Sequence, residues 1–256
     1  ISMTIRLSTQ LRNNLVGPKG VGATFANGIV EIRSGSQPAS ADSAATGTLL
    51  GTVTIASGTF TAETRASATI TLSGSSGSIN TVNIGTTGPV NIIPLGAVNF
   101  VTDLATTAEA LRDAIIRAGI CHATSSGAVV TVVAPSGTGD AWNGLALSTT
   151  VTTMSATSSG NMTGGIDAVN GITFGAPSAG VLSKTGIWSF TGVASGTAGW
   201  FRIKASAYDD NLASTTLARL DGSIAVSGAD MNLSSVSITI GMPTTIDTLT
   251  ITMPAS

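Results

Sequence analysis

Charged side chains are scarce in this sequence. Asp, Glu, Lys and Arg make up 9% of its 256 residues, against about 25% in an average soluble protein. The formal net charge is −2, and the basic residues are scattered along the chain. Such a sequence has no general attraction to nucleic acid or to an anionic membrane, so neither is expected as a partner. Because so little ionic surface is available, we expect much of the exterior to be buried against other subunits.

Disulfides and membrane-spanning segments are also excluded. Cys121 is the only cysteine, so no disulfide can form within the chain. No segment reaches the roughly 18 consecutive apolar residues of a membrane span. The first residues lack the apolar run of a secretory signal. The sequence therefore favours a protein that is made in the cytoplasm.

Aromatic residues are few, and most of them lie in one stretch. Six of the ten fall between Phe174 and Tyr208. Each large ring buries roughly 150–250 Å², so we expect this stretch to form the centre of the fold. Within it, apolar residues at 201, 203 and 205 alternate with Trp200, Arg202 and Lys204. This alternation predicts a half-buried antiparallel strand with one cationic face.

A short amphipathic helix is predicted near the N-terminus. Ser8 can serve as its N-cap, the helix covers residues 9–15, and Gly17 followed by Pro18 ends it. Three leucines form an apolar stripe along this arm: Leu7, Leu11 and Leu15. The stripe could pack on its own domain or on a neighbouring subunit.

Strands of similar style are predicted on both sides of the middle of the chain. The first lies at residues 29–35, where Glu31 and Arg33 mark a solvent face. The others are predicted at residues 49–55, 217–226, 236–240 and 248–253.

The segment between these groups has a different pattern and carries one helix. Thr106 and Glu109 match a capping box, which predicts a helix over residues 107–118 that ends at Gly119. An ion pair is expected between Asp113 and Arg117, four residues apart on the polar face. Strands are predicted around the helix at residues 69–74, 79–85, 90–100, 121–126, 128–134 and 145–154.

The simplest organisation is a mainly β protein with one domain inserted into another. Residues 1–64 and 165–256 are predicted to form a discontinuous antiparallel β-sandwich or jelly-roll-like domain. Residues 65–164 are predicted to form a small inserted α+β domain carrying the one helix. Gly-rich junctions at both ends suit an insertion, because exposed loop tips tolerate added domains.

Chemically reactive groups are weakly represented. Cys121 and His122 are adjacent, but neighbouring side chains in a strand point to opposite faces and cannot share a proton. The run Asp209–Asn211 has oxygen ligands but lacks the spacing of a calcium loop. The glycines of the loop at residues 135–140 resemble a phosphate-binding loop without its lysine or its helix. No cofactor, metal or catalytic residue is predicted, and an enzyme is the least favoured class.

The outer part of the sequence resembles a family of small virion proteins of tailed bacteriophages. The similar segments are ATFANGIVEIRSGSQPASADSAATGTLLGTVTI, GITFGAPSAGVLSKTGIWSFTGVASGTAGWFRIKAS, RLDGSIAVSGADMNL and IDTLTITMPA. The middle, with NFVTDLATTAEALRDAII and HATSSGAVVTVVAPSGTGDAWNG, resembles a module grafted into various phage structural proteins. Together the two resemblances cover nearly the whole chain.

The resemblance implies a non-enzymatic capsid decoration or auxiliary protein on the virion. Its expected partners are other copies of itself, with a trimer favoured, and the major capsid protein or other virion proteins. The alternatives are a neck or tail protein, or an adhesin for host glycans in which Trp142 stacks on a sugar ring. We expect the outer domain to attach to the virion and the inserted domain to face solvent. The candidate interface residues are Leu7, Leu11, Leu15, Trp188, Trp200 and Trp142.

Overall fold

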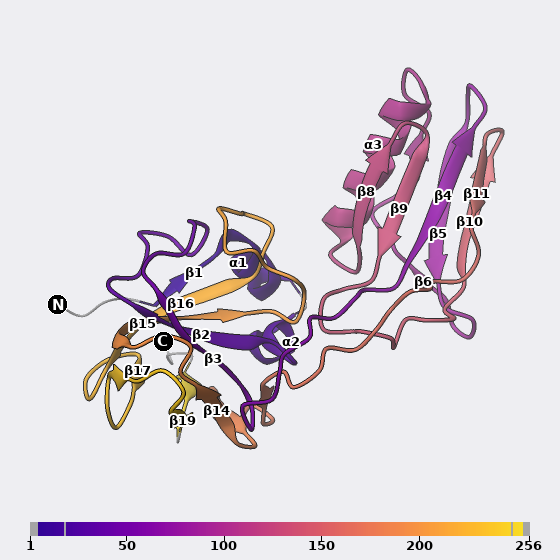
Figure 1. Cartoon of the computed structure of the whole chain (residues 1–256). Coiled ribbons are helices and arrows are strands. Elements are labelled where there is room, and N and C mark those ends of the chain that lie inside the picture. The colour runs from indigo at the N-terminus through magenta and orange to yellow at the C-terminus, as the bar shows by residue number, and fades with distance from the viewer. Residues whose placement is uncertain (1–4, 18, 247, 253–256) are drawn as a thin grey trace. The chain divides into compact units, whose positions relative to one another are not determined.

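The computed structural model describes residues 5–17, 19–246 and 248–252, and it is mainly β, as predicted (Figure 1). The chain divides into two compact units. The outer unit combines the residues up to Glu63 with those from Ala168 onward, and the inserted unit is Thr64–Asp167. The boundaries expected from sequence lay at residues 64/65 and 164/165.

A nine-stranded sheet forms the centre of the outer unit. In spatial order its main path runs through β1 (Arg6–Leu7), β16 (Arg219–Ala225), β15 (Gly196–Lys204), β2 (Ile29–Ser34), β3 (Leu49–Ile55), β14 (Trp188–Thr191) and β19 (Pro243–Ile246). Two short strands are attached to this path, β17 (Met231–Asn232) beside β16 and β18 (Ser237–Ile238) beside β15. All of these pairs are antiparallel except β16 with β17.

Smaller elements complete the outer unit. A three-stranded sheet contains β12 (Thr173–Phe174), β13 (Val181–Thr185) and β20 (Thr250–Thr252). Helix α1 (Thr9–Val16) begins at Ser8, whose hydroxyl accepts a hydrogen bond from the Leu11 amide, so the predicted cap is confirmed. Pro18, the predicted helix stop, lies outside the described residues. Helix α2 (Val21–Phe25) was not predicted.

One face of the large sheet forms an aromatic and aliphatic core. Phe201 pairs in register with Ile32 on one side and with Gly222 on the other. Gly222 leaves room for the Phe201 ring, since a Cβ atom there would lie 2.5 Å from it. Gly51 leaves room for the Phe190 ring in the same way, since a Cβ atom at Gly51 would overlap that ring. Glycine weakens a strand in general, but at these two positions it allows large rings to pack on the sheet.

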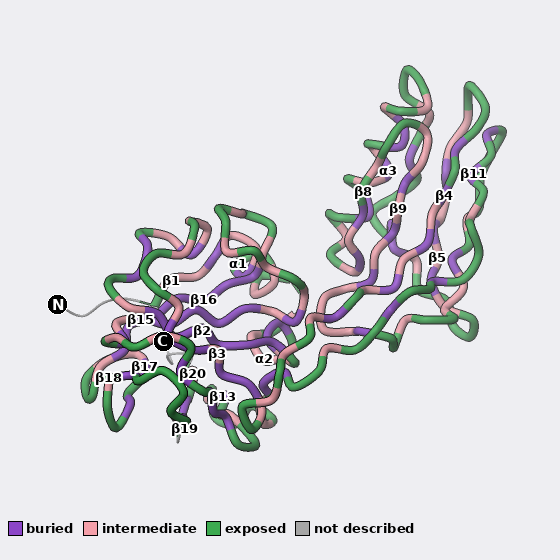
Figure 2. Tube along the Cα trace, in the orientation of Figure 1, coloured by how far each residue is buried: buried purple, intermediate pink, exposed green. Residues whose placement is uncertain are grey.

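The opposite face of the same sheet is also buried, which corrects two predictions. Glu31 and Arg33 are 4% and 9% exposed, so they do not mark a solvent face. Arg202 and Lys204 are 0% and 5% exposed, so β15 is buried on both faces rather than half-buried. Figure 2 shows β2 and β16 buried along most of their length. The charged side chains point into the protein because loops cover them.

The inserted unit contains two four-stranded sheets and helix α3 (Leu104–Ala118). One sheet has the order β11 (Ser155–Ser158), β4 (Ser67–Ser73), β9 (Val129–Val133) and β8 (His122–Ser126). The other contains β10 (Leu147–Thr152), β5 (Ser78–Ile84), β6 (Val90–Asn91) and β7 (Val98–Asn99). One aliphatic core joins both sheets and the buried face of α3. Burial along β4 alternates, as expected for a sheet with one solvent face.

The ends of α3 differ partly from the prediction. The N-cap is Asp103, whose carboxylate accepts a hydrogen bond from the Thr106 amide at 2.8 Å, so the predicted capping box is wrong. Asp103 caps the helix in the way expected of Thr106, by accepting a hydrogen bond from a backbone amide of the first turn, but it lies three residues earlier in the chain. The predicted stop at Gly119 is confirmed, because this residue adopts a left-handed conformation with φ of 73°. The predicted Asp113–Arg117 ion pair is replaced by one between Asp113 and Arg112, at 2.8 Å.

Candidate functional site

The largest concentration of ionisable groups lies on the buried polar face of the outer unit, which we call the charged layer. Its members come from β2, β15, β16 and the loop after β15. They are Glu31, Arg33, Arg202, Lys204, Asp209, Arg219 and Asp221. Strand register explains how they meet, because Arg202 lies opposite Glu31 on one side and Asp221 on the other. The layer was missed from sequence because the partners are far apart in the chain.

Arg202 and Asp221 form the most deeply buried pair. The Nε and Nη2 atoms of Arg202 each donate to one oxygen of Asp221 at 2.7 Å, and both side chains are fully buried. Nη2 also donates to the Ser43 carbonyl at 3.1 Å. A bidentate pair with a further backbone acceptor offsets much of the cost of removing two charges from water.

Arg219 repeats this arrangement with Asp209. Its Nε and Nη2 atoms donate to the two carboxylate oxygens at 2.7 and 2.6 Å. Nη1 donates to the Leu212 carbonyl at 2.8 Å. Asp209, the first residue of the run that could have supplied calcium ligands, is therefore occupied by Arg219. No group of three or more metal-ligating side chains occurs among the described residues.

Glu31 bridges two cations. Its carboxylate accepts from Lys204 Nζ and Arg33 Nε, each at 2.9 Å, and from the Asn211 amide at 2.9 Å. Burial would raise the pKa of Glu31, but Lys204, Asn211 and Arg33 together outweigh burial and hold the pKa below its usual 4.5.

The other two carboxylates respond differently to the same environment. Burial also opposes ionisation of Asp209, yet Arg219 and Lys204 outweigh it and lower its pKa. At Asp221 burial prevails, and the pKa is raised despite the hydrogen bonds from Arg202. All three carboxylates are engaged by cations within the fold, so the charged layer is a network of buried ion pairs.

Two loops cover the charged layer. The loop of residues 35–48 and the loop of residues 205–218 are joined by backbone hydrogen bonds from Ala45 to Asn211 and from Ser214 to Asp42, at 2.9 and 2.8 Å. The Asp42 carboxylate accepts from the amide and the hydroxyl of Thr9 at 2.8 and 2.7 Å. The start of α1 thereby holds the cover in place.

Trp200 is part of the charged face and not of a surface. Its indole Nε1 donates to the Ser34 carbonyl at 3.2 Å. The guanidinium carbons of Arg202 and Arg33 lie 5.5 and 6.0 Å from the ring centroid, within the range of cation–π attraction. The Nη1 atom of Arg202 has no hydrogen-bond partner among the described residues, so the ring supplies part of its stabilisation.

Three of the candidate interface residues are buried in the outer unit. Leu11, Trp188 and Trp200 are 0% exposed and present no surface to a partner in this structure. Leu7 and Leu15 are half-buried and pack against the same core. The large rings and the leucine stripe pack together with the aliphatic side chains of the same core.

The candidates in the inserted unit also lie within the fold. Trp142 is half-buried against the aliphatic core. Cys121 is buried, and burial raises the pKa of its thiol to about 12, so the thiol remains protonated. The glycine loop has its own acidic partner, because the Asp167 carboxylate accepts from the Asp140 amide at 3.1 Å. A Cβ atom at Gly139 would clash with this carboxylate, so the loop closes on a side chain of its own unit.

An exposed apolar group on the outer unit was not predicted. We define the turn patch as Val193, Ile240 and Met242, which are 56%, 62% and 57% exposed. Two turns at the ends of β14 and β19 carry it, and backbone hydrogen bonds join them between Gly192 and Met242 and between Gly241 and Gly192. The feature of the sequence that could have indicated this patch is an apolar residue next to a glycine in each turn.

A second surface feature of the outer unit is aromatic. Tyr208 is 77% exposed at the edge of a pocket of about 250 Å³. Phe60, Ala62 and Ala207 also line this pocket. Lys204 and Asp209, which belong to the charged layer, line the pocket as well.

Comparisons with known proteins identify no relative. No protein-family model, no curated protein and no solved structure matches the chain. Among the described residues, no helix is both long and apolar enough to cross a membrane.

Proposed function

We propose that the protein is a non-enzymatic structural component of a phage virion, most simply a capsid decoration protein that assembles with copies of itself. The virion context rests on the sequence resemblance. The observation that carries attachment is the turn patch of the outer unit. Exposed apolar residues grouped on a charge-poor surface are typical of protein–protein contacts. In this proposal the outer unit attaches to the head lattice through the turn patch.

The test is reconstitution on particles that lack this protein. The full chain and a chain with residues 64–167 replaced by a Gly/Ser linker are expected to bind. The double variant Val193→Asp and Ile240→Asp is expected to lose binding, because two carboxylates would be buried at the contact. Val16→Asp is the matched control, since Val16 is 90% exposed on the same unit outside the turn patch.

The proposal fails if the aspartate variant binds as well as the full chain, or if binding requires the inserted unit. Circular dichroism of each variant separates loss of binding from loss of folding. Light scattering at micromolar concentration tests self-assembly, and a monomer mass would contradict it. Images of reconstituted particles distinguish a head position from the alternative position at the neck or tail.

Attachment to host glycans is a second candidate, and Tyr208 is the observation that favours it. An exposed aromatic ring beside a pocket is suited to stacking on a sugar ring. Binding of the full chain to immobilised cell-surface glycans would support this function if Tyr208→Ala abolished it. Binding that is unchanged in Tyr208→Ala would count against the site.

A further inference from the structure

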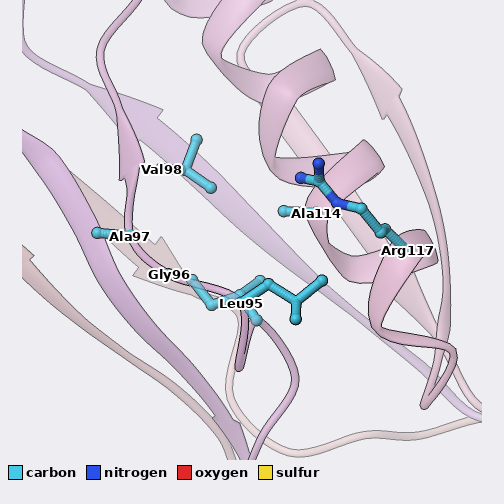
Figure 3. A pocket seen from close by; sticks show the side chains of 7 residues that line it. Leu95, Gly96, Ala97, Val98, Ala114 and Arg117 are labelled. Atoms are coloured by element: carbon cyan, nitrogen blue, oxygen red, sulfur yellow. The ribbon is translucent and has the colours of Figure 1, made fainter.

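A small pocket opens in the inserted unit between the C-terminal half of α3 and the segment that leads into β7. Its volume is about 120 Å³. Ile93, Val98 and Ala114 form an apolar lining and are at most 9% exposed. Leu95 is 70% exposed at the edge. Figure 3 shows Arg117 on the helix side of the pocket, near Ala114, with Leu95 and Val98 on the facing segment.

The facing segment is held in shape by its backbone. The Gly96 amide donates to the Ile93 carbonyl at 3.3 Å, which closes a turn at the edge of the pocket. Gly96 has a φ of 128°, a backbone conformation that residues other than glycine rarely adopt. The pocket is therefore formed by a turn and a helix whose backbones are each fixed by their own hydrogen bonds.

The charge of Arg117 is not neutralised within the described part of the chain. Asp113 lies one helical turn away, but its carboxylate accepts from Arg112 Nε at 2.8 Å. Arg117 has no ion pair or hydrogen bond to any described residue. A cation in the last helical turn is favoured by the helix dipole, which explains why an unpaired arginine is tolerated there. Its five donors remain available to an anion.

We propose that this pocket binds a small organic carboxylate. The apolar part of the ligand packs on Leu95, Val98 and Ala114. Its carboxylate accepts charge-assisted hydrogen bonds from Arg117. An apolar protein cavity of about 150 Å³ holds one benzene molecule, so this open pocket is suited to one ring or a short branched chain. A carboxylate attached to an apolar group is found both in a free organic acid and at the C-terminal residue of a peptide. The proposal is independent of attachment to a virion.

The test is a two-dimensional NMR titration of the full chain with benzoate. Shifts are expected to saturate at the amides of residues 95–98 and 114–117. Benzamide has the same ring without the charge and is expected to bind about tenfold more weakly, since a hydrogen bond to a charged group contributes about 1.5–3 kcal/mol. Acetate lacks the ring and is also expected to bind about tenfold more weakly. N-acetylphenylalanine tests the peptide source of the same chemistry.

Arg117→Gln is expected to weaken benzoate binding about tenfold, and Arg117→Lys to retain part of it. Arg112→Gln is the matched control, because Arg112 lies on the same helix and is already paired. Its affinity for benzoate is expected to stay within about twofold. Arg117 is exposed, so its substitution should leave the rest of the spectrum unchanged.

Three results would overturn the proposal. They are the absence of saturable shifts at the pocket, equal affinity for benzoate and benzamide, and an Arg117→Gln variant that binds benzoate as well as the unmodified chain. If benzoate binds and N-acetylphenylalanine does not, the ligand is a free acid. If both bind and N-acetylphenylalanine binds more tightly, the ligand is a peptide terminus.

Discussion

The outer and inserted units use similar Thr-, Ser- and Gly-rich sequences in different ways. In the outer unit, every residue of β2 except the last is buried, and one of its two faces carries charge. In the inserted unit, β4 alternates between buried and exposed positions, and the strands carry no Asp, Glu, Lys or Arg. Alternation of polar and apolar residues therefore has opposite meanings in the two units.

The difference comes from what covers the second face of each sheet. In the outer unit, the loops of residues 35–48 and 205–218 supply carbonyl acceptors and carboxylates to the arginines of β15 and β16. A sheet face without such a cover can carry only side chains that water solvates well. Long loops with few apolar residues can thus serve as part of a polar interior.

The largest expected contrast between the units concerns ion pairs. Asp221→Ala should lower the free energy of unfolding of the outer unit by about 3–5 kcal/mol, because Arg202 would stay buried without its partner. Asp113→Ala breaks the exposed pair with Arg112 in the inserted unit and should cost less than about 1 kcal/mol. Denaturant unfolding followed by near-ultraviolet circular dichroism measures both. Equal costs would mean that Asp221 is solvated in solution.

The second prediction tests whether the two cores are independent. Leu111 is fully buried on the core-facing side of α3, so Leu111→Ala should destabilise the inserted unit by about 2–5 kcal/mol. Trp188 belongs to the core of the outer unit. The unfolding midpoint of the outer unit, followed by the indole NMR signal of Trp188, should therefore be the same in Leu111→Ala as in the unmodified chain. A matching shift of both transitions would show that the units unfold together.

Lowering the pH should reduce the stability of the outer unit more than that of the inserted unit. The pKa of Glu31 is lowered from 4.5 and that of Asp209 from 3.8, so their stabilising effect is complete above these values. It is lost as pH falls from about 4.5 through the lower folded-state pKa values. The raised pKa of Asp221 acts in the opposite direction and reduces this loss. Glu31→Gln should flatten the decline in thermal midpoint between pH 5 and 3, and an unchanged slope would contradict the assignment.

The smallest effect is expected at the start of α3. Asp103→Ala removes the side-chain acceptor of the Thr106 amide and should lower the melting temperature of the inserted unit slightly. Asp103→Ser keeps an acceptor and should lower it less. Thr106→Ala should have little effect, because Thr106 is not the cap. If Thr106→Ala were the more damaging change, the helix would begin where the capping box placed it.

Local signals predicted the elements that depend on neighbouring residues. Ser8 begins α1 and Gly119 ends α3 because caps act through amides and carbonyls within a few positions. The start of α3 was misjudged because Asp103 and Thr106 both offer an acceptor at the right spacing. The turn patch and the free guanidinium of Arg117 were missed for a related reason. Whether an apolar or charged side chain remains unpartnered depends on all of its neighbours.

The sequence by itself determined the mainly β class, the start of α1, the end of α3 and the alternation of polar and apolar residues along the strands. Tertiary structure decided which faces became interior. Alternation reports only that two faces differ, because adjacent side chains of a strand point in opposite directions. Glu31 and Lys204 are 173 positions apart in the chain, yet their side chains meet at 2.9 Å. A charged face becomes interior when such long-range pairing satisfies each charge, and no local pattern records that pairing.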